Sequence, residues 1–289
     1  MNLGFWAILF TSFLWGTTGV VASFAPQLSP FAIGAAAMGG GGILQALFAI
    51  KSLKREIFCL TQSFKLIILG GLAVAVYPLA FYASMHYAGI TIGTVISIGS
   101  APLFSALLER FFDAKKLTLT WFLSVGLGIL GVVLLSMGEG SHPLGNHKNL
   151  GIGLGILAGI SYALYSWLAR RVMHSGISSK ATMGAIFGIG GIILLPTLAF
   201  TGQNLFENTT HTLVITYMTI FPMFLGYVLF GYGLKKVTAS TALTITLSEP
   251  LIAALLAMLI VKEILSFVGV IGMILIIVSI FIVSYRPKI

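Results

Sequence analysis

The stretch SEPLIAALL, residues 248–256, repeats the stretch SAPLFSALL, residues 100–108, and both lie inside long apolar segments. The two stretches are 148 residues apart, about half the length of the 289-residue chain. Internal similarity at a fixed offset indicates repeated structural units. We therefore predict two similar halves, residues 1–143 and residues 148–289.

The composition indicates that these halves lie in a membrane. Hydrophobic residues make up 58% of the chain, charged residues make up 8%, and the mean hydropathy is +1.06. A soluble domain is about a quarter charged, because its surface must be hydrated. The net charge of +9 comes from Lys and Arg dispersed between apolar runs, whereas nucleic-acid-binding proteins gather them in one stripe. The sequence thus excludes a soluble domain and predicts no nucleic-acid partner.

Ten apolar segments follow one another along the chain, each close to the roughly 20 residues that one helical crossing of a bilayer needs. They cover residues 3–22, 30–50, 66–87, 91–109, 118–137, 150–169, 181–200, 211–233, 238–260 and 264–285. The first segment follows no basic residue and is longer than the apolar core of a signal peptide, so we expect it to remain as a helix. The predicted fold is an all-α membrane protein with ten transmembrane helices, five in each half.

The distribution of Lys and Arg predicts how these helices are oriented, because cytoplasmic loops accumulate basic residues. With the N-terminus inside, fourteen of the sixteen Lys and Arg fall in cytoplasmic segments, and only Lys148 and Lys262 fall outside. We therefore expect both termini to be cytoplasmic. Because five is odd, the second half must cross the membrane in the opposite direction to the first. Inverted repeats of this kind place a substrate site between the halves, near the bilayer midplane.

Three short motifs, taken with their order and spacing, resemble the drug/metabolite transporter superfamily, in particular its EamA-type ten-helix members. They are Leu14-Trp15-Gly16, the run PLFSALL at residues 102–108 and the run LSEPL at residues 247–251. The resemblance covers both halves. It implies a solute carrier, with a bacterial cytoplasmic membrane as the expected location. Many such carriers export amino acids or related metabolites, and others move amines, nucleotide precursors or drugs.

Glu249 is the sharpest single candidate for a functional residue, because it lies near the middle of the ninth segment. A charge at that depth costs about 2.5–3.5 kcal/mol on insertion scales, so it should face a cavity or a partner. Three interpretations stay open. Glu249 can bind a cationic group of the substrate, exchange a proton that couples transport, or accept hydrogen bonds that serve packing or gating alone.

Polar aromatic side chains recur at comparable depth in several segments, although Trp and Tyr ordinarily gather at the membrane interfaces. Each one alone is more often a packing residue than a ligand, but together they predict a site lining that suits an amino acid or an organic cation. The predicted substrate-binding residues are Trp15, Tyr77, Tyr82, Ser100, Tyr162, Tyr165, Tyr227 and Glu249.

Coupling or gating is predicted for Glu249, His86, Pro102 and Pro250. Pro102 and Pro250 are equivalent in the two halves, and a proline inside a helix removes one hydrogen bond and opens the preceding turn. The alternative for each proline is simple shaping of the helix. His86 lies inside the third apolar segment, whereas the other histidines lie in or at the edge of loops, and either a hydrogen-bonded interfacial histidine or a proton relay is possible there. No metal site and no cofactor is expected, because the histidines lack metal-ligand spacing.

These observations predict a secondary transporter that works by alternating access on small organic metabolites, with amino acids or amine-type solutes as the expected cargo and export as the expected direction. Its partners are then a small-molecule solute, the lipid bilayer and, as a candidate coupling ion, the proton; a monomer and a homodimer both fit. A proton-coupled exporter of drugs or organic cations, or a channel, is the alternative within transport. An intramembrane enzyme is the alternative class, but Glu249 has no catalytic companion in the sequence.

Overall fold

The computed structural model describes residues 3–138, 147–261 and 266–284, and every regular element in these ranges is helical. Within them, ten helices or helix chains are long and apolar enough to cross a membrane, which confirms the predicted ten-helix fold. Residues 1–2 and 285–289 lie outside the described ranges, so the cytoplasmic placement of both termini stays a prediction, as does the place of Lys262.

Seven of the ten crossings are single uninterrupted helices. These helices are α1 (Leu3–Ala22), α2 (Pro30–Arg55), α4 (Phe64–Ala88), α5 (Ile90–Phe112), α6 (Leu119–Gly138), α7 (Lys148–His174) and α14 (Phe267–Ser284), with the short α3 (Ile57–Gln62) between α2 and α4. Gly89, which has a φ of 94°, separates α4 from α5. The helix α8 (Ser179–Leu194) runs through a 3₁₀ turn into α9 (Leu198–Thr201).

Two crossings in the second half depart from a regular α-helix along their length. One consists of α10 (Thr209–Met218), a π-helical segment (Thr219–Gly226) and α11 (Tyr227–Leu234). The other consists of α12 (Ala239–Ile245), α13 (Ser248–Leu256) and a second π-helical segment (Ala257–Val261). Such departures leave some backbone groups without their α-helical partner, which membrane proteins tolerate only beside protein or a water-filled cavity.

The two prolines predicted to open a helical turn, Pro102 and Pro250, therefore have different surroundings in the two halves. Pro250 lies in the first turn of α13, directly after the break at residues 246–247, where its missing N–H costs no helical hydrogen bond. Pro102 is buried inside α5, and that helix runs past it without interruption. The two prolines are equivalent in sequence, but only the second one accompanies a break in its helix.

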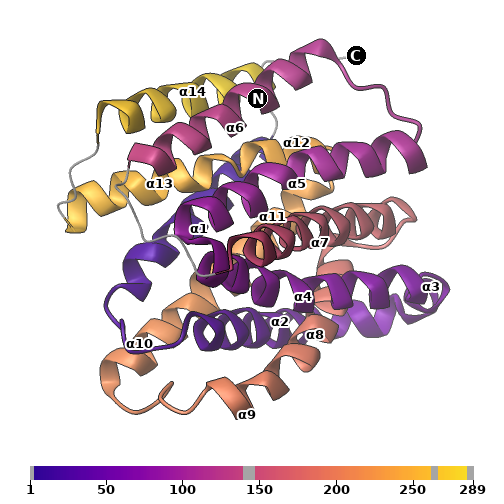
Figure 1. Cartoon of the computed structure of the whole chain (residues 1–289). Coiled ribbons are helices and arrows are strands. Elements are labelled where there is room, and N and C mark those ends of the chain that lie inside the picture. The colour runs from indigo at the N-terminus through magenta and orange to yellow at the C-terminus, as the bar shows by residue number, and fades with distance from the viewer. Residues whose placement is uncertain (1–2, 139–146, 262–265, 285–289) are drawn as a thin grey trace.

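The helices run roughly parallel to one another in a bundle (Figure 1). The main packed pairs are α4 with α7, α6 with α14, and α2 with α8, and α6 and α14 lie together at one side of the bundle (Figure 1). Small residues allow the closest approaches. A side chain at Gly42 of α2 would overlap the Phe187 carbonyl oxygen of α8, and a side chain at Gly159 of α7 would overlap Ser100 of α5. These contacts follow the small-residue packing that is common between membrane helices.

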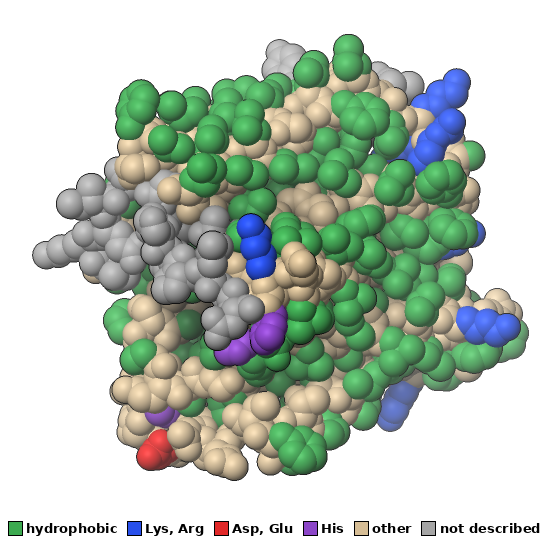
Figure 2. Space-filling model, viewed as in Figure 1, with side chains coloured by type: hydrophobic (Ala, Val, Ile, Leu, Met, Phe, Trp, Pro, Cys, Tyr) green, Lys and Arg blue, Asp and Glu red, His purple; other side chains and the backbone are tan. Residues whose placement is uncertain are grey.

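One end of the bundle, called the basic end below, is formed by residues 51–65, 110–117, 170–180 and 235–238. Every described Lys and Arg except Lys148 belongs to these segments, and the blue side chains in Figure 2 gather mainly on that side. The surface between the ends is largely hydrophobic (Figure 2), as expected of a face that contacts lipid.

Candidate functional site

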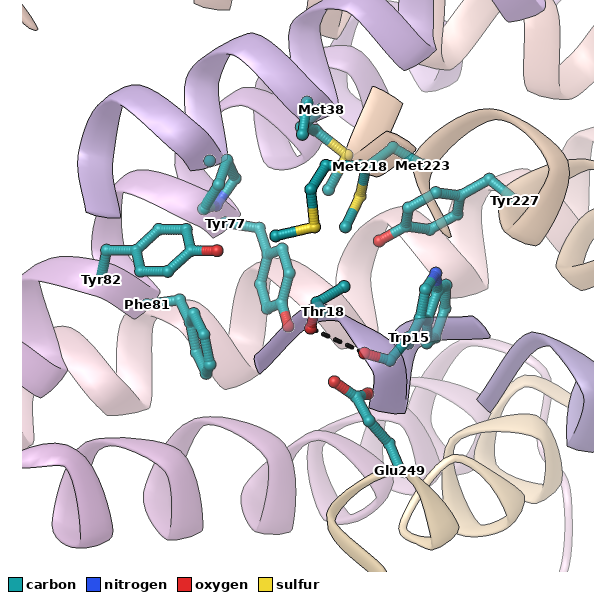
Figure 3. Close-up of a pocket in the computed structure, with 13 residues that line it drawn as sticks. Trp15, Thr18, Met38, Tyr77, Phe81, Tyr82, Met218, Met223, Tyr227 and Glu249 are labelled. Atoms are coloured by element: carbon teal, nitrogen blue, oxygen red, sulfur yellow. Dashed lines mark hydrogen bonds between the residues drawn. The ribbon is translucent and has the colours of Figure 1, made fainter. Parts of the chain in front are cut away.

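A cavity lies in the middle of the bundle, between α1, α2, α4, the first π-helical segment and α13 (Figure 3). The space inside the lining of this central cavity amounts to about 590 Å³, part of which is continuous with the surroundings of the protein. Its walls are rings, thioethers and small residues around one carboxylate. They consist of Trp15, Thr18, Gly34, Ala37, Met38, Tyr77, Pro78, Phe81, Tyr82, Met218, Met223, Tyr227 and Glu249.

A second hollow, the outer cavity, continues from the central cavity toward the end of the bundle opposite the basic end. The two share Trp15, Thr18, Phe81, Tyr82, Met218 and Glu249 in their walls. The outer cavity then reaches Ala22 at the end of α1, Met85 near the end of α4 and Ile90 at the start of α5. The site is therefore accessible from the end opposite the basic end.

Glu249 supplies the only charged side chain among the described residues that line these cavities. It lies in the first turn of α13, and Figure 3 shows its carboxylate directed into the cavity toward Thr18 and Tyr77. The Thr18 hydroxyl donates to the carbonyl oxygen of Trp15 at 2.7 Å. Within the described chain, the Glu249 carboxylate accepts no hydrogen bond and forms no ion pair. An unpartnered carboxylate at this depth needs a proton or a cation.

Two tyrosines place free hydroxyl groups opposite this carboxylate. The Tyr77 and Tyr82 rings come from one turn and a half of α4, and Figure 3 shows both hydroxyls inside the cavity. Neither hydroxyl has a hydrogen-bond partner among the described residues. The Tyr82 ring lies directly against Gly34 of α2, where any side chain would overlap it. Gly34 therefore determines how deep the Tyr82 ring can sit in the wall.

The widened turn around Pro222 is held by polar side chains from the first half. The Trp15 indole Nε1 donates to the Pro222 carbonyl oxygen at 3.0 Å, and the Thr11 hydroxyl lies 3.0 Å from the Gly226 carbonyl oxygen. Gln45 of α2 reaches the Met223 carbonyl oxygen with its Nε2 at 3.4 Å. These contacts satisfy carbonyl groups that an ordinary α-helix would have paired internally, and they hold α1 and α2 to the second half beside the cavity.

An aromatic layer closes the central cavity toward the basic end; it is formed by Trp15, Tyr162, Tyr165, Phe187, Tyr227 and Phe230. All six side chains are buried. The Tyr165 and Tyr227 hydroxyls are 3.0 Å apart, and the Tyr162 hydroxyl donates to Thr246 Oγ1 at 3.1 Å. The ring centroids of Phe187 and Tyr227 are 4.3 Å apart. Packed and hydrogen-bonded rings leave no passage for a solute in this direction.

A hydrogen-bonded and ion-paired set of side chains, the Glu109 network, joins α5 to α12 between the aromatic layer and the basic end. Glu109 is 0% exposed, and its Oε2 lies 2.6 Å from both Lys115 Nζ and Ser240 Oγ. Lys115 Nζ is also 3.1 Å from Ser240 Oγ, and the Ser240 N–H donates to Glu109 Oε1 at 3.3 Å. A buried carboxylate is stable only when it is paired and hydrogen-bonded in this way. The Glu109 network is thus a second closure at the basic end.

Two further carboxylates at the basic end join other helices. Asp113 accepts the Trp167 indole Nε1 at 2.7 Å and pairs with Arg171 at 3.2 Å, which connects the end of α5 to α7. Glu56 accepts the Ser178 N–H at 2.7 Å, which connects α2 to the start of α8. Partial burial raises the pKa of Glu56, but the hydrogen bonds from Arg55 and Ser178 outweigh it, so that the pKa lies below its usual value.

The predicted site residues fall into three groups. Trp15, Tyr77, Tyr82, Tyr227 and Glu249 all line the central cavity, and Tyr162 and Tyr165 belong to the aromatic layer. The remaining four predicted residues have other surroundings, which are described next.

Ser100 packs against Gly159 at the contact of α5 with α7, and its hydroxyl has no partner in the described chain. Pro102 is buried within α5 away from both cavities. His86 is exposed at the end of α4, with its ring centroid 5.0 Å from that of Tyr87. Pro250 lines the outer cavity. Their predicted roles in binding or gating stay predictions.

Several residues of the site were absent from the sequence-based set. Met38, Met218 and Met223 place thioethers together above the tyrosines (Figure 3), although only the last two are close in sequence. Methionine is common in apolar helices, so nothing in the sequence marks these three. Glu109 could have been identified from the sequence, because it is the only acidic residue in the fourth apolar segment.

Comparison with known proteins places the whole chain among membrane transporters. The model of the EamA-like transporter family matches it twice, over residues 2–137 and over residues 149–285. The chain is 30% identical to an uncharacterized transporter of Bacillus subtilis, YwfM, over 97% of this chain and 93% of that protein. It is 26% identical to an uncharacterized transporter of Archaeoglobus fulgidus over 96% of this chain and 98% of that protein.

A plant protein and a solved structure extend the comparison. A WAT1-related chloroplastic protein of Arabidopsis thaliana is 23% identical over 97% of this chain and 69% of that protein. A crystal structure of a protein with 18% sequence identity superposes with a TM-score of 0.78, covering 95% of this chain and 94% of the other. At that identity the superposition supports the fold alone.

Proposed function

We propose that this chain, which belongs to the EamA-like transporter family, is a secondary transporter that carries amine-bearing solutes, amino acids among them, by alternating access. The chain is a multi-pass cell membrane protein and a transporter rather than an enzyme. The cargo, the coupling and the direction are the proposed part.

The observation that carries the proposal is the unpartnered carboxylate of Glu249 in a cavity that rings, thioethers and small residues otherwise line and that has no basic side chain among the described residues of its wall. A positively charged amine can satisfy this carboxylate, and its substituents can lie against the faces of Trp15 and Tyr227. A phosphate ester or a simple carboxylic acid would meet the negative charge of Glu249 with no basic side chain nearby to offset it. The lining therefore favours cationic and zwitterionic solutes over anions.

The free hydroxyls of Tyr77 and Tyr82 extend the proposal from amines to amino acids. They are donors on the wall opposite Glu249 and can bind the carboxylate of a zwitterion while Glu249 binds its ammonium group. A simple amine or a quaternary ammonium ion has no group that needs these hydroxyls. Organic cations remain the second candidate cargo, and the observation in their favour is the cluster of Met38, Met218 and Met223, because thioethers adapt to bulky apolar groups.

In the proposed cycle, the central cavity opens to one end of the bundle at a time. The structure has the site open to the end opposite the basic end and closed toward the basic end by the aromatic layer and the Glu109 network. If the basic end is cytoplasmic, this is the outward-open state, and loading from the cytoplasm requires both closures to open. A proton on Glu249 can replace the ammonium group after its release, which would couple export to proton entry.

Counterflow in proteoliposomes tests the proposal. Purified protein is reconstituted with an internal unlabelled amino acid or amine, and uptake of the labelled solute is measured between pH 5.5 and 8.5. We expect exchange that is stimulated by internal solute and depends on pH, and we expect Glu249→Gln to lose both. Glu207→Gln, which changes an exposed acid in a loop, is the matched control and should behave like the wild type. Pore-like flux without exchange, or pH-dependent exchange by Glu249→Gln, would refute the mechanism.

A second measurement separates the two kinds of cargo. Tyr77→Phe and Tyr82→Phe remove the free hydroxyls and keep the rings, so they should weaken exchange of amino acids about tenfold and leave exchange of the matching decarboxylated amines unchanged. Tyr87→Phe is the control outside the cavity. Equal losses for the amino acid and its amine would contradict the predicted role of the hydroxyls.

A further inference from the structure

A separate pocket of about 470 Å³ lies on the side of the bundle near the basic end, between α2, α8 and α11. No residue of its wall is shared with the central or the outer cavity. Its wall is mostly apolar, but Gln45, Ser179 and Lys180 contribute polar groups. The transport cycle proposed above does not use this pocket.

Two lysines flank the pocket without a carboxylate partner. Lys180 Nζ lies 3.5 Å from the ring centroid of Phe48, and Lys236 Nζ lies 2.5 Å from the Tyr232 hydroxyl; both rings line the pocket. In the part of the chain that the structure describes, neither lysine forms an ion pair. The Lys115 ammonium, by contrast, is paired with Glu109 at 2.6 Å. The pocket therefore has one unneutralised positive charge in its wall, that of Lys180, and a second beside it, that of Lys236, which contacts the hydroxyl of the wall residue Tyr232.

The other features of the pocket suit a lipid molecule. Phe48 is 49% exposed and Tyr232 is 42% exposed, so the pocket opens sideways toward the bilayer. The lysines lie at the membrane-surface ends of their crossings, where lipid phosphates lie, since Lys180 is in the first turn of α8 and Lys236 follows α11. Gln45 is 2% exposed, and its Oε1 has no hydrogen-bond partner in the described chain. This buried acceptor in the wall can take a hydrogen bond from a bound hydroxyl or water.

We infer that this pocket is a binding site for an anionic phospholipid of the phosphatidylglycerol class. The phosphate lies between Lys180 and Lys236, and an acyl chain follows the apolar wall past Phe48 and Tyr232. A net negative headgroup is required because two unpaired ammonium groups face it; a zwitterionic headgroup would bring a third positive charge. Basic pockets between transmembrane helices are known to hold such headgroups. The bound lipid would connect the start of α8 to the end of α11.

Native mass spectrometry of the delipidated full-length protein tests this inference, with phosphatidylglycerol or phosphatidylcholine added. We expect retained adducts of phosphatidylglycerol and a higher Tm with this lipid than with phosphatidylcholine. Lys180→Gln and Lys236→Gln should each weaken phosphatidylglycerol binding about fivefold, from roughly 1 kcal/mol for each basic residue at an anionic surface. Lys65→Gln and Lys116→Gln are matched controls, because both change basic-end lysines outside the pocket. The Tm of every variant in phosphatidylcholine reports whether it is folded.

Three results would overturn the inference. One is phosphatidylglycerol binding by folded Lys180→Gln that is as tight as in the wild type. Another is an equal loss in the Lys65→Gln and Lys116→Gln controls, which would mean a diffuse attraction to the basic end. The third is a dimer that Lys180→Gln dissociates, which would assign the pocket to a second copy of the chain. None of these results depends on which solute is carried, so this inference and the proposed transport function can fail separately.

Discussion

Ser240→Ala tests whether the Glu109 network keeps the basic end closed. The Ser240 hydroxyl donates to Glu109 Oε2 at 2.6 Å and lies 3.1 Å from Lys115 Nζ, so its removal takes a hydrogen bond from a buried carboxylate. A hydrogen bond to a charged group contributes about 1.5–3 kcal/mol. Because about 1.4 kcal/mol corresponds to a tenfold change, the population open at the basic end should rise about 10- to 150-fold.

A cysteine placed between the aromatic layer and the basic end can report this population. Ser166 is fully buried one helical turn after Tyr162, on the basic-end side, and Ser166→Cys is a small change there. The exposed native Cys59 is first replaced by serine. We expect the maleimide reaction rate of the probe, measured in nanodiscs, to rise with Ser240→Ala by the factor given above.

The control removes a comparable hydrogen bond elsewhere in the bundle. Ser124 donates to the Ser279 carbonyl oxygen at 2.8 Å and connects α6 to α14, so Ser124→Ala should leave the labelling rate unchanged. An unchanged rate in Ser240→Ala, or an equal rise in Ser124→Ala, would refute the role of the Glu109 network as a closure.

Three further predictions follow from contacts around the cavity and at the basic end. Trp15→Phe removes the hydrogen bond to the Pro222 carbonyl and should lower the free energy of unfolding by about 1–3 kcal/mol, measured by denaturant titration; an unchanged value would contradict the contact. Gly34→Ala should push the Tyr82 ring into the cavity and weaken solute binding in calorimetry, while Ala37→Gly, in the same wall, should not. The lowered pKa of Glu56 predicts a stabilising contact present at neutral pH and lost as pH falls through that pKa; Glu56→Gln should flatten this acid dependence of Tm, and an unchanged slope would exclude it.

The fold could be predicted from the sequence because a bilayer leaves few choices. An apolar segment of about 20 residues must form a helix, since no water is present to pair its backbone. The ten predicted segments accordingly match the ten crossings, and α1 begins and ends at the predicted residues 3 and 22. The breaks inside the eighth and ninth crossings were not predicted as such, because their freed carbonyls are satisfied by partners such as Trp15 that are distant in sequence.

The candidate site could be predicted at positions where a polar side chain lies within an apolar segment. Glu249 and the mid-segment tyrosines are polar groups in apolar segments, and several of them line the central cavity. Met38 and Met218 are apolar residues in apolar segments, so only the packing of α2 against the second half shows that they share a wall. Glu109 is recognisable as a charge, but its partner Ser240 is 131 residues away, and no sequence pattern connects the two.

The hydrogen bond from Trp15 to the Pro222 carbonyl makes this part of the cavity wall a pivot. If this hydrogen bond persists through the proposed cycle, the same face of the Trp15 ring would meet the solute from either compartment. Under the proposed cycle, affinity at that face would then be similar on both sides of the membrane. Net flow would then follow the concentration difference of the solute and the available proton gradient.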